Sequence, residues 1–268
     1  MATESNPAII SVPSMPTDRQ PISAVIVTLN EVSRLEACLR SVAFCDEIVV
    51  VDSGSSDGTR ELAQRLGARV IEEPWRGYGA QKQFAVEQAA NDWVLCVDAD
   101  ERVSERLREA IVAALPGPVA SAFRFARCNR FLGRYLRHGE GYPDWSLRLF
   151  NRRHAHWSLD PVHEKVIADG EAVTLPGDLL HDSAETLESY LAKQNRYTSL
   201  AAQEALARGK RASAGHLVLS PLLRFFKFYF LRLGFLDGLP GLIHILIGCT
   251  NSFVKYAKML QSQHLTVR

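Results

Sequence analysis

The sequence lacks several features that would identify a function directly. Its 31 basic and 30 acidic residues leave a formal charge of +1, so no overall positive excess points to nucleic acid as a partner. The apolar region at residues 233–254 is interrupted by Asp237, Pro240 and four glycines, so we predict no membrane-spanning helix. The five cysteines have no paired spacing for a metal site, and they are typical of reduced core residues in a cytoplasmic protein.

The chain does contain enough apolar material for a large core. With 268 residues and 47% hydrophobic content, it can form one large core, or an α/β core with a helical appendage. The first 20 residues contain Pro7, Pro13, Pro16 and several Ser and Thr, and they lack an apolar signal core. We therefore expect residues 1–20 to be a flexible leader.

An acidic stretch around residue 100 is the most informative part of the chain. The apolar run at residues 93–97 reads as a buried strand, and it ends in Asp98, Asp100 and Glu101. Carboxylates two residues apart repel each other unless a cation lies between them, and hard oxygen ligands suit Mg²⁺ or Mn²⁺ on a substrate's phosphates. The alternative is a solvated turn that happens to be acidic.

Strand-like and helix-like stretches alternate along the first 115 residues. Strand patterns cover residues 22–29, 47–51, 69–72 and 93–97, and helical patterns cover residues 31–43, 59–66, 80–90 and 104–115. This alternation predicts an α/β fold with a mostly parallel, Rossmann-like sheet and helices on both faces. Ligands of such sheets bind outside the carboxyl ends of the strands, so Asn30, Asp52 and Asp98 should converge at one edge.

The loop at residues 52–59 follows a strand and is built from small polar residues. Its Asp52 can accept from ribose hydroxyls or from a pyrimidine N–H, which favours a nucleoside ligand. The loop matches neither the Gly-x-Gly-x-x-Gly pattern nor a Walker loop, which counts against dinucleotide and triphosphate sites. A capping turn explains Asp57 equally well, and it explains Asp52 less well.

The alternation weakens after residue 118. Residues 120–128 and 145–151 read as strands, and on the second of these Trp145, Leu147 and Leu149 should share one face. The segment at residues 129–144 between them is long, basic and aromatic, which is typical of a functional loop. A polar helix is expected at residues 187–207.

The composition changes again beyond Gly215. Residues 217–236 contain six aromatic side chains interrupted by Arg224, Lys227 and Arg232. Aromatic residues mixed with cations favour a helix that lies in a membrane interface. A core helix packed on the sheet, or a helix that pairs with a second copy, is the alternative.

Four short motifs together resemble glycosyltransferase family 2, whose members are inverting enzymes of the GT-A type fold. They are Thr28-Leu29-Asn30-Glu31, residues 50–59 (VVDSGSSDGT), Gly79-Ala80-Gln81-Lys82 and Asp98-Ala99-Asp100. Three further stretches resemble the subgroup that adds glucose to the lipopolysaccharide inner core through a β-1,4 linkage. They are residues 145–150 (WSLRLF), Val162-His163-Glu164-Lys165 and residues 234–238 (GFLDG).

The resemblance implies roles for individual residues. The nucleotide-sugar site would comprise Thr28, Asn30, Glu31, Asp52, Ser55, Asp57, Gln81, Lys82, Asp98 and Ala99. Asp98 and Asp100 would hold Mn²⁺ or Mg²⁺ on the diphosphate, where the metal offsets the charge that accumulates on the departing UDP. His181 is a candidate third metal ligand, and a core or capping histidine is its alternative.

An inverting transfer also needs a base to take the proton of the acceptor hydroxyl. Many family members use a Glu-Asp pair, which this chain lacks, and Glu164 is the candidate here. A surface carboxylate is the alternative for Glu164. Trp145, Arg148 and His163 are candidate acceptor-binding residues, although a structural ion pair explains Arg148 equally well.

These observations predict a metal-dependent inverting hexosyltransferase that moves a sugar, expected to be glucose, from a UDP-sugar to a lipid-linked saccharide. We expect residues 21–118 to form the nucleotide-sugar-binding half, residues 119–186 the acceptor-binding half and residues 187–268 a helical region. The helical region would place the enzyme peripherally on the cytoplasmic side of the inner membrane. Nucleic acid is not an expected partner, and a homo-oligomer is left open.

Three alternative functions remain at this stage. The acceptor could be a capsule or protein glycan, or the chain could bind a sugar nucleotide without catalysis. A nucleotidyltransferase with a similar sheet is the third alternative, and it would release pyrophosphate from a nucleoside triphosphate and a sugar phosphate.

Overall fold

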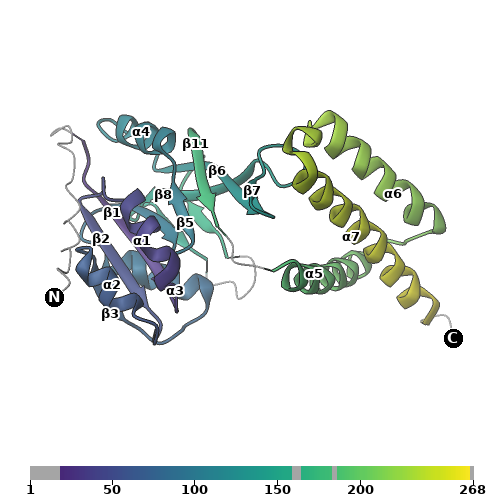
Figure 1. The fold of residues 1–268 in the computed structure, drawn as a ribbon, viewed down its shortest axis with the longest axis horizontal. Coiled ribbons are helices and arrows are strands. Elements are labelled where there is room, and N and C mark those ends of the chain that lie inside the picture. Colours follow the sequence, from purple (N-terminus) through teal and green to yellow (C-terminus); the bar gives the residue numbers. More distant parts are fainter. Residues whose placement is uncertain (1–18, 159–163, 183–185, 266–268) are drawn as a thin grey trace, which may run out of the picture. The chain divides into compact units, whose positions relative to one another are not determined.

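The computed structural model describes residues 19–158, 164–182 and 186–265. The chain divides into two compact units (Figure 1). The first, the sheet unit, contains the residues up to 127 together with residues 144–181. The second, the helical unit, contains residues 128–143 and the chain from residue 182 onward.

The sheet unit begins with four parallel strands in the order β3-β2-β1-β4. The strands are β1 Ile22–Thr28, β2 Glu47–Asp52, β3 Arg69–Glu72 and β4 Trp93–Asp98. Helices α1 Val32–Ser41, α2 Thr59–Arg65 and α3 Tyr78–Gln88 connect them. The near-continuous apolar runs of β1 and β4 suit strands that are covered on both faces. The α/β prediction for this part of the chain is confirmed.

The same sheet continues past β4 with strands in the order β8-β6-β11-β5, so that it is mixed. These strands are β8 Asp144–Asn151, β6 Ala122–Phe131, β11 Val173–His181 and β5 Glu101–Val103. Strand β8 runs antiparallel to both β4 and β6, and β11 runs antiparallel to β5. A separate hairpin, β9 Ala155–Trp157 with β10 Val166–Ala168, completes the strands of this unit.

Helices cover both faces of the sheet. On one face α1, α2 and α4 (Glu105–Ala114) bury Leu39, Leu62 and Ile111 against the strands. On the other face α3 packs through Ala85 and Val86, beside the β9–β10 hairpin. Full burial of a leucine or isoleucine side chain contributes about 1.5–3 kcal/mol. The two cores together hold the strand ends, and therefore the loops that follow them, in fixed positions.

The prediction that Trp145, Leu147 and Leu149 share one face of the strand is wrong, because the alternation is interrupted at Arg148. Leu149 packs in the core on the α1 face, whereas Leu147 packs with Phe150 on the α3 face. The cause is a β-bulge, because Phe123 of β6 pairs with Leu149 while the next residue, Arg124, pairs with Leu147. The extra residue turns Arg148 inward.

The helical unit starts with a tight hairpin between β6 and β7 (Arg134–Tyr135), whose turn residues Leu132 and Gly133 both have positive φ. The predicted helix at residues 187–207 is confirmed as α5 (Leu187–Ala207), and the Thr186 side chain caps its start. After it come α6 (Ala214–Phe226), a π-helical turn η1 (Lys227–Leu231), a 3₁₀ turn η2 (Gly234–Asp237) and α7 (Gly238–Leu265).

The apolar residues 217–236 therefore belong to three short elements and not to one helix. The helical path breaks at Leu233, which has a φ of 55°, and again at Gly238, which has a φ of 64°. In the described part of the chain no single helix is long and apolar enough to cross a membrane. The bent pair of residues 214–231 and 234–263, with an angle of 75° between its arms, meets that test by length and composition.

The compact units do not coincide with the three segments expected from the sequence. Residues 119–127 and 144–181 belong to the same sheet as the first 118 residues. Residues 128–143 belong with the C-terminal helices, where Arg134 donates to the Leu236 carbonyl and the Asp237 carboxylate accepts from the N–H groups of Arg137 and His138. The functional meaning of the predicted segments stays a prediction.

Candidate active site

The ends of three parallel strands meet at one edge of the sheet. Thr28 at the end of β1 pairs with Asp52 at the end of β2, and Val27 pairs with Asp98 at the end of β4. Because parallel strands carry their carboxyl ends to the same edge, the polar residues that follow them are neighbours. This is the convergence that the sequence predicts for Asn30, Asp52 and Asp98.

Asp52 organises the first loop at this edge. Its fully buried carboxylate accepts from the Thr28 hydroxyl at 2.9 Å and from the backbone N–H groups of Gly54 at 3.0 Å and Ser55 at 2.8 Å. The Ser55 hydroxyl also donates to Asp52, and it accepts from the Asn30 backbone N–H at 2.8 Å. Four predicted nucleotide-site residues thus form one network, which fixes the shape of the loop.

Asp57 has the capping geometry that was its alternative explanation. Its two carboxylate oxygens accept from the backbone N–H of Val32, which begins α1, and from that of Thr59, which begins α2. The Thr59 hydroxyl and these N–H groups lower the pKa of Asp57. Asp57 therefore joins two helix starts beside the predicted pocket.

Glu31 and Gln81 flank the same loop from opposite directions. The Glu31 carboxylate lies 2.8 Å from Arg34, and burial raises its pKa while Arg34 opposes that rise. The Gln81 side chain is buried in α3 and donates to the Ser53 hydroxyl at 3.1 Å. Arg34 also lies 3.9 Å from Asp100, and no sequence pattern marks it as a site residue.

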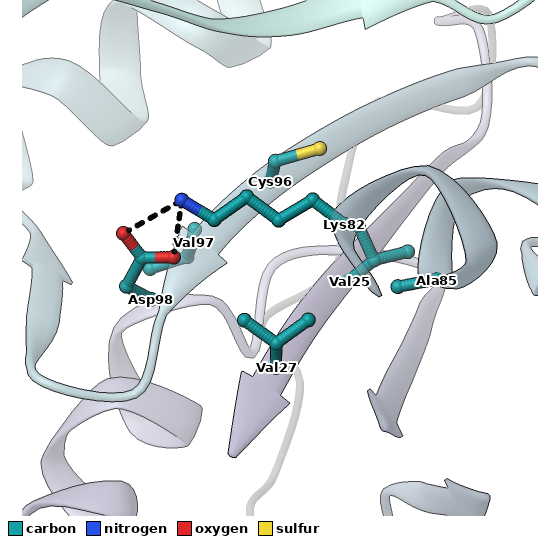
Figure 2. A pocket seen from close by; sticks show the side chains of 7 residues that line it. All are labelled: Val25, Val27, Lys82, Ala85, Cys96, Val97 and Asp98. Atoms are coloured by element: carbon teal, nitrogen blue, oxygen red, sulfur yellow. Dashed lines mark hydrogen bonds and ion pairs between the residues drawn. The ribbon is translucent and has the colours of Figure 1, made fainter. Parts of the chain in front are cut away.

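Lys82 joins the candidate base to the acidic motif. Its ammonium lies 3.2 Å from the Asp98 carboxylate (Figure 2). It also lies 3.3 Å from Glu164, and the residue is only 7% exposed. A small pocket around this contact is lined by Val25, Val27, Lys82, Ala85, Cys96, Val97 and Asp98 (Figure 2). Residues from α3, β4 and the segment before β10 are thereby brought to one place.

The ion pair that was the alternative explanation for Arg148 lies next to this contact and is buried, and Glu101 is a partner that was not predicted. Arg148 is 5% exposed and donates to Asp98 at 2.9 Å and to Glu101 at 3.2 Å. Glu101 is fully buried, and it also accepts from the Asp98 backbone N–H at 3.0 Å. The structure favours the ion pair for Arg148 over acceptor binding, because the bulge turns it away from solvent. The burial of Arg148 could have been predicted only by locating the β-bulge, and no glycine or other turn residue marks the bulge in the sequence.

Electrostatics keep Asp98 ionised. Burial alone would raise the pKa of Asp98, but Arg148 and Lys82 hold it well below the usual range of a carboxyl. Burial raises the pKa of Glu101, with Arg148 opposing the rise. The two cations thus balance the negative charge that two neighbouring carboxylates concentrate at the end of β4.

Asp100 and His181 approach each other on the solvent side of the motif. The His181 Nε2 atom lies 3.2 Å from the Asp100 carboxylate, and both side chains are about one fifth exposed. Within the described residues, no group of three His, Cys, Asp or Glu side chains is arranged to hold a metal ion. A carboxylate oxygen and an imidazole nitrogen fit a divalent ion that takes its remaining ligands from a diphosphate. Asp98 would join them only by exchanging one of its cation partners.

The other predicted residues are less informative. Ala99 is buried between the two aspartates, and Trp145 is half exposed with Arg124 over its ring at 5.6 Å. His163 lies outside the described residues. The roles predicted for these three residues stay predictions.

Comparison with known proteins shows similarity to glycosyltransferases over most of the chain. The lipopolysaccharide core biosynthesis glycosyltransferase LpsC of Rhizobium meliloti (strain 1021) is 35% identical over 256 residues, which cover 92% of this chain and 95% of that protein. An uncharacterized glycosyltransferase of Rickettsia felis is 32% identical over 266 residues, with 90% of each chain covered.

Two solved structures are similar over different shares of the chain. The mannosyltransferase PcManGT of Pyrobaculum calidifontis, in complex with GDP-Man and Mn²⁺, is 19% identical and covers 95% of this chain and 91% of its own, with a TM-score of 0.49. Glucosyl-3-phosphoglycerate synthase of Mycobacterium tuberculosis is 26% identical over 41% of this chain and 44% of its own, with a TM-score of 0.35.

The family model for glycosyl transferase family 2 matches residues 23–166, which contain β1 to β4, the acidic motif and Glu164. This match and the full-length similarity to LpsC show that the chain, with its α/β sheet of the GT-A type, belongs to glycosyl transferase family 2.

Proposed function

We propose that this glycosyltransferase moves glucose from UDP-glucose to a lipid-linked saccharide such as the lipopolysaccharide core, with inversion at the anomeric carbon. The observation that carries the proposal is the contact of Lys82 with both Asp98 and Glu164. This contact brings Asp98, which is suited to binding the sugar-nucleotide donor, next to Glu164, which is suited to proton transfer. The name of the LpsC relative supports the acceptor class.

Glu164 is the proposed general base. It takes the proton of the acceptor hydroxyl, the hydroxyl oxygen forms the new bond to C1 of the sugar, and the bond from C1 to the UDP oxygen breaks with its electrons on the diphosphate. Lys82 holds the Glu164 carboxylate in position, and its positive charge would add to the field that stabilises the departing diphosphate. The loop ordered by Asp52 would receive the uridine.

A divalent ion, Mn²⁺ or Mg²⁺, would be held by Asp100 and His181, with Asp98 as the third predicted ligand. When bound, it supplies positive charge that stabilises the diphosphate as it departs. Arg148 would keep Asp98 oriented in the absence of that ion.

We further propose that the enzyme works as a peripheral protein on the cytoplasmic face of the inner membrane, where a lipid-linked acceptor is found. Support comes from the helical unit, whose α6 has no buried residue and exposes Leu222 and Leu223 by more than 60%. Exposed apolar surface of this extent marks an interaction site.

Two measurements test the proposed function. A thermal-shift screen of UDP-glucose, UDP-galactose and GDP-mannose, with and without Mn²⁺, should show the largest stabilisation for UDP-glucose with the metal. UDP release should then depend on an added lipopolysaccharide-core acceptor. Stabilisation without transfer to any glycan acceptor would indicate a sugar-nucleotide-binding protein, and pyrophosphate release from UTP and glucose 1-phosphate would indicate a nucleotidyltransferase.

A further inference from the structure

Helix α6 exposes apolar residues and partly buries polar ones, which is the reverse of a surface helix in a water-soluble protein. From Leu217 to Phe226 the exposed residues are all apolar, namely Val218, Leu219, Leu222, Leu223 and Phe226. The polar residues Ser220 and Arg224 of the same stretch are partly buried. A surface helix normally turns its charged and polar residues toward water and its apolar stripe toward the protein.

The polar residues on one face of α6 contact α7 and Glu140, with Ser220 and Arg224 partly buried and His216 exposed. His216, Ser220 and Arg224 follow one another at intervals of four and therefore share one face of the helix. His216 stacks on Tyr256 at 4.9 Å between ring centroids, and the Ser220 and Ser252 hydroxyls lie 2.6 Å apart. These contacts join α6 to α7 along a polar seam.

An ion pair continues the polar seam toward the turns that connect α6 and α7. Arg224 donates to both carboxylate oxygens of Glu140. A Cβ at Gly248 of α7 would contact the Glu140 carboxylate, so a larger residue there would require this carboxylate to shift. This ion pair, with side-chain exposures of 34% for Arg224 and 19% for Glu140, thus lies on the face where apolar residues would lie in a soluble helix pair.

Helix α7 repeats the pattern on its own outer side. Leu239, Leu246 and Phe253 are 66%, 47% and 46% exposed and follow at intervals of seven, which puts them in one stripe. The exposed Thr250 beside them donates its hydroxyl to the Leu246 carbonyl at 3.0 Å, which satisfies that donor within the helix. Internal satisfaction of polar groups with apolar residues outside is what a hydrocarbon environment requires.

The charge of the C-terminal region identifies the kind of surface that covers this face. Residues 205–268 contain nine basic residues, Arg208, Lys210, Arg211, Arg224, Lys227, Arg232, Lys255, Lys258 and Arg268, and one acidic residue, Asp237. Asp237 is 2% exposed, whereas Lys210, Arg211, Lys227 and Arg232 are exposed at the two ends of α6. Cations that flank an apolar stripe complement the anionic headgroups of a bilayer.

We propose that α6 and α7 form an inside-out helical hairpin whose two apolar stripes lie among the acyl chains of an anionic bilayer while the polar seam stays enclosed between the helices. This goes beyond adsorption at the headgroups, because the leucine and phenylalanine side chains leave water. The inference rests on the proposed membrane association but on no step of sugar transfer. A second copy of the chain is the competing occupant of the same face.

Site-directed fluorescence tests the proposal. Leu222→Cys and Leu246→Cys each place a thiol in one stripe, and Ala192→Cys on the exposed side of α5 is the matched control. The five native cysteines are buried, so an environment-sensitive thiol probe labels the introduced site in the native protein. The labelled full-length proteins are mixed with vesicles of phosphatidylcholine and phosphatidylglycerol.

We expect probes at Leu222→Cys and Leu246→Cys to shift to shorter emission wavelengths with vesicles, to lose quenching by aqueous iodide and to be quenched by nitroxides on the lipid acyl chains. The probe at Ala192→Cys should remain accessible to iodide. Vesicle binding with both stripe probes still open to iodide would mean adsorption only and would overturn the proposal. Shielding that needs no vesicles and grows with protein concentration would assign the face to a second copy.

The test separates this inference from the proposed function. A lack of vesicle binding would overturn the hairpin proposal together with the membrane association. Transfer to a soluble, deacylated acceptor would still report on the glycosyltransferase site. Conversely, a protein that inserts both stripes but transfers no glucose would contradict only the proposed donor or acceptor.

Discussion

At the scale of single residues, Lys82 connects the two carboxylates, Asp98 and Glu164, on which the proposed chemistry depends. It is almost fully removed from water, two carboxylates lie within 3.3 Å of its ammonium, and the Trp157 ring lies 4.9 Å from it. A lysine held in this way is a fixed positive charge rather than a mobile surface group. It links the end of β4 to Glu164, which is distant in sequence.

If Glu164 is the base, its replacement should affect catalysis far more than binding. Glu164→Gln should lower kcat by about 10²–10⁴-fold, because loss of a general base removes that factor, and should leave the KM for the sugar nucleotide within a few-fold. Steady-state kinetics of UDP release would measure both constants. Glu171→Gln, an exposed glutamate on the other side of β10, is the control. Unchanged kcat in Glu164→Gln would remove the assignment.

The buried pair beneath the site should contribute to stability. Arg148→Met removes the nearest cation of the buried Glu101 and one of the two cations of Asp98, and breaking such a buried pair costs about 3–5 kcal/mol. Urea denaturation would measure the free energy of unfolding. The exposed Arg40 pairs with Glu36 one turn away, so Arg40→Met should cost less than about 1 kcal/mol. Equal losses in the two variants would contradict the structural role of Arg148.

Burial should also keep the native thiols unreactive at mildly alkaline pH. Burial raises the pKa of Cys96 to about 12, so the thiol binds its proton more tightly in the folded chain than in the unfolded chain. Alkylation by iodoacetamide at pH 8 should therefore be slow until denaturant is added, and faster at each higher pH. Mass spectrometry would follow it. Rapid alkylation of Cys96 in the native protein would show that the strand is not buried.

At the scale of elements, close packing of α3 on Ser158 and Glu164 positions Lys82. A Cβ at Gly79 would lie 2.2 Å from the Ser158 carbonyl oxygen and 3.4 Å from the Glu164 Cβ. Because the nearest atom belongs to backbone, it cannot move as a flexible side chain would. The helix that carries Lys82 and the segment that carries Glu164 must therefore approach through glycine.

Gly79→Ala should separate Lys82 from Glu164 and lower both donor binding and turnover. We expect a smaller thermal shift with UDP-glucose and a reduced rate of UDP release. Gly117→Ala is the control, since a Cβ there meets nothing within 4 Å and its backbone does not need a positive φ. A fully active Gly79→Ala enzyme would contradict the dependence of the site on this contact.

Elements with a clear period could be predicted from the sequence, and those set by long-range pairing could not. Strands β1 to β4 and helices α1 to α5 follow from local patterns, as do the strand-end positions of Asp52 and Asp98, whereas β5 was not predicted. The bulge at Arg148 depends on how β8 pairs with β6, which no local pattern records. The same holds for Glu101, whose partners lie on other strands.

At the scale of the whole chain, charge is divided between its two parts. Residues 205–268 contain nine basic residues and one acidic residue, a formal charge of +8, and the full chain has 31 and 30. The first 204 residues therefore contain 22 basic and 29 acidic residues, a formal charge of −7. A near-neutral total thus hides a strongly basic C-terminal region. An anionic membrane would attract this region and repel the rest.

This division predicts how vesicle binding depends on salt and on individual cations. Binding of the full-length protein to anionic vesicles should be strongest at low ionic strength and should weaken as salt screens the headgroups. Each lysine or arginine near such a surface contributes about 1 kcal/mol, so replacing Lys210 and Arg211 by glutamine should weaken binding by about 30-fold.

The matched control removes two exposed cations of the sheet unit, through Arg65→Gln and Arg106→Gln together. Vesicle sedimentation should show unchanged or slightly stronger binding for this variant, because the region it alters is already acidic. Equal weakening in both double variants would mean that binding follows total charge and not the basic C-terminal region. In that case the helical unit would have no special part in bringing the transferase to its acceptor.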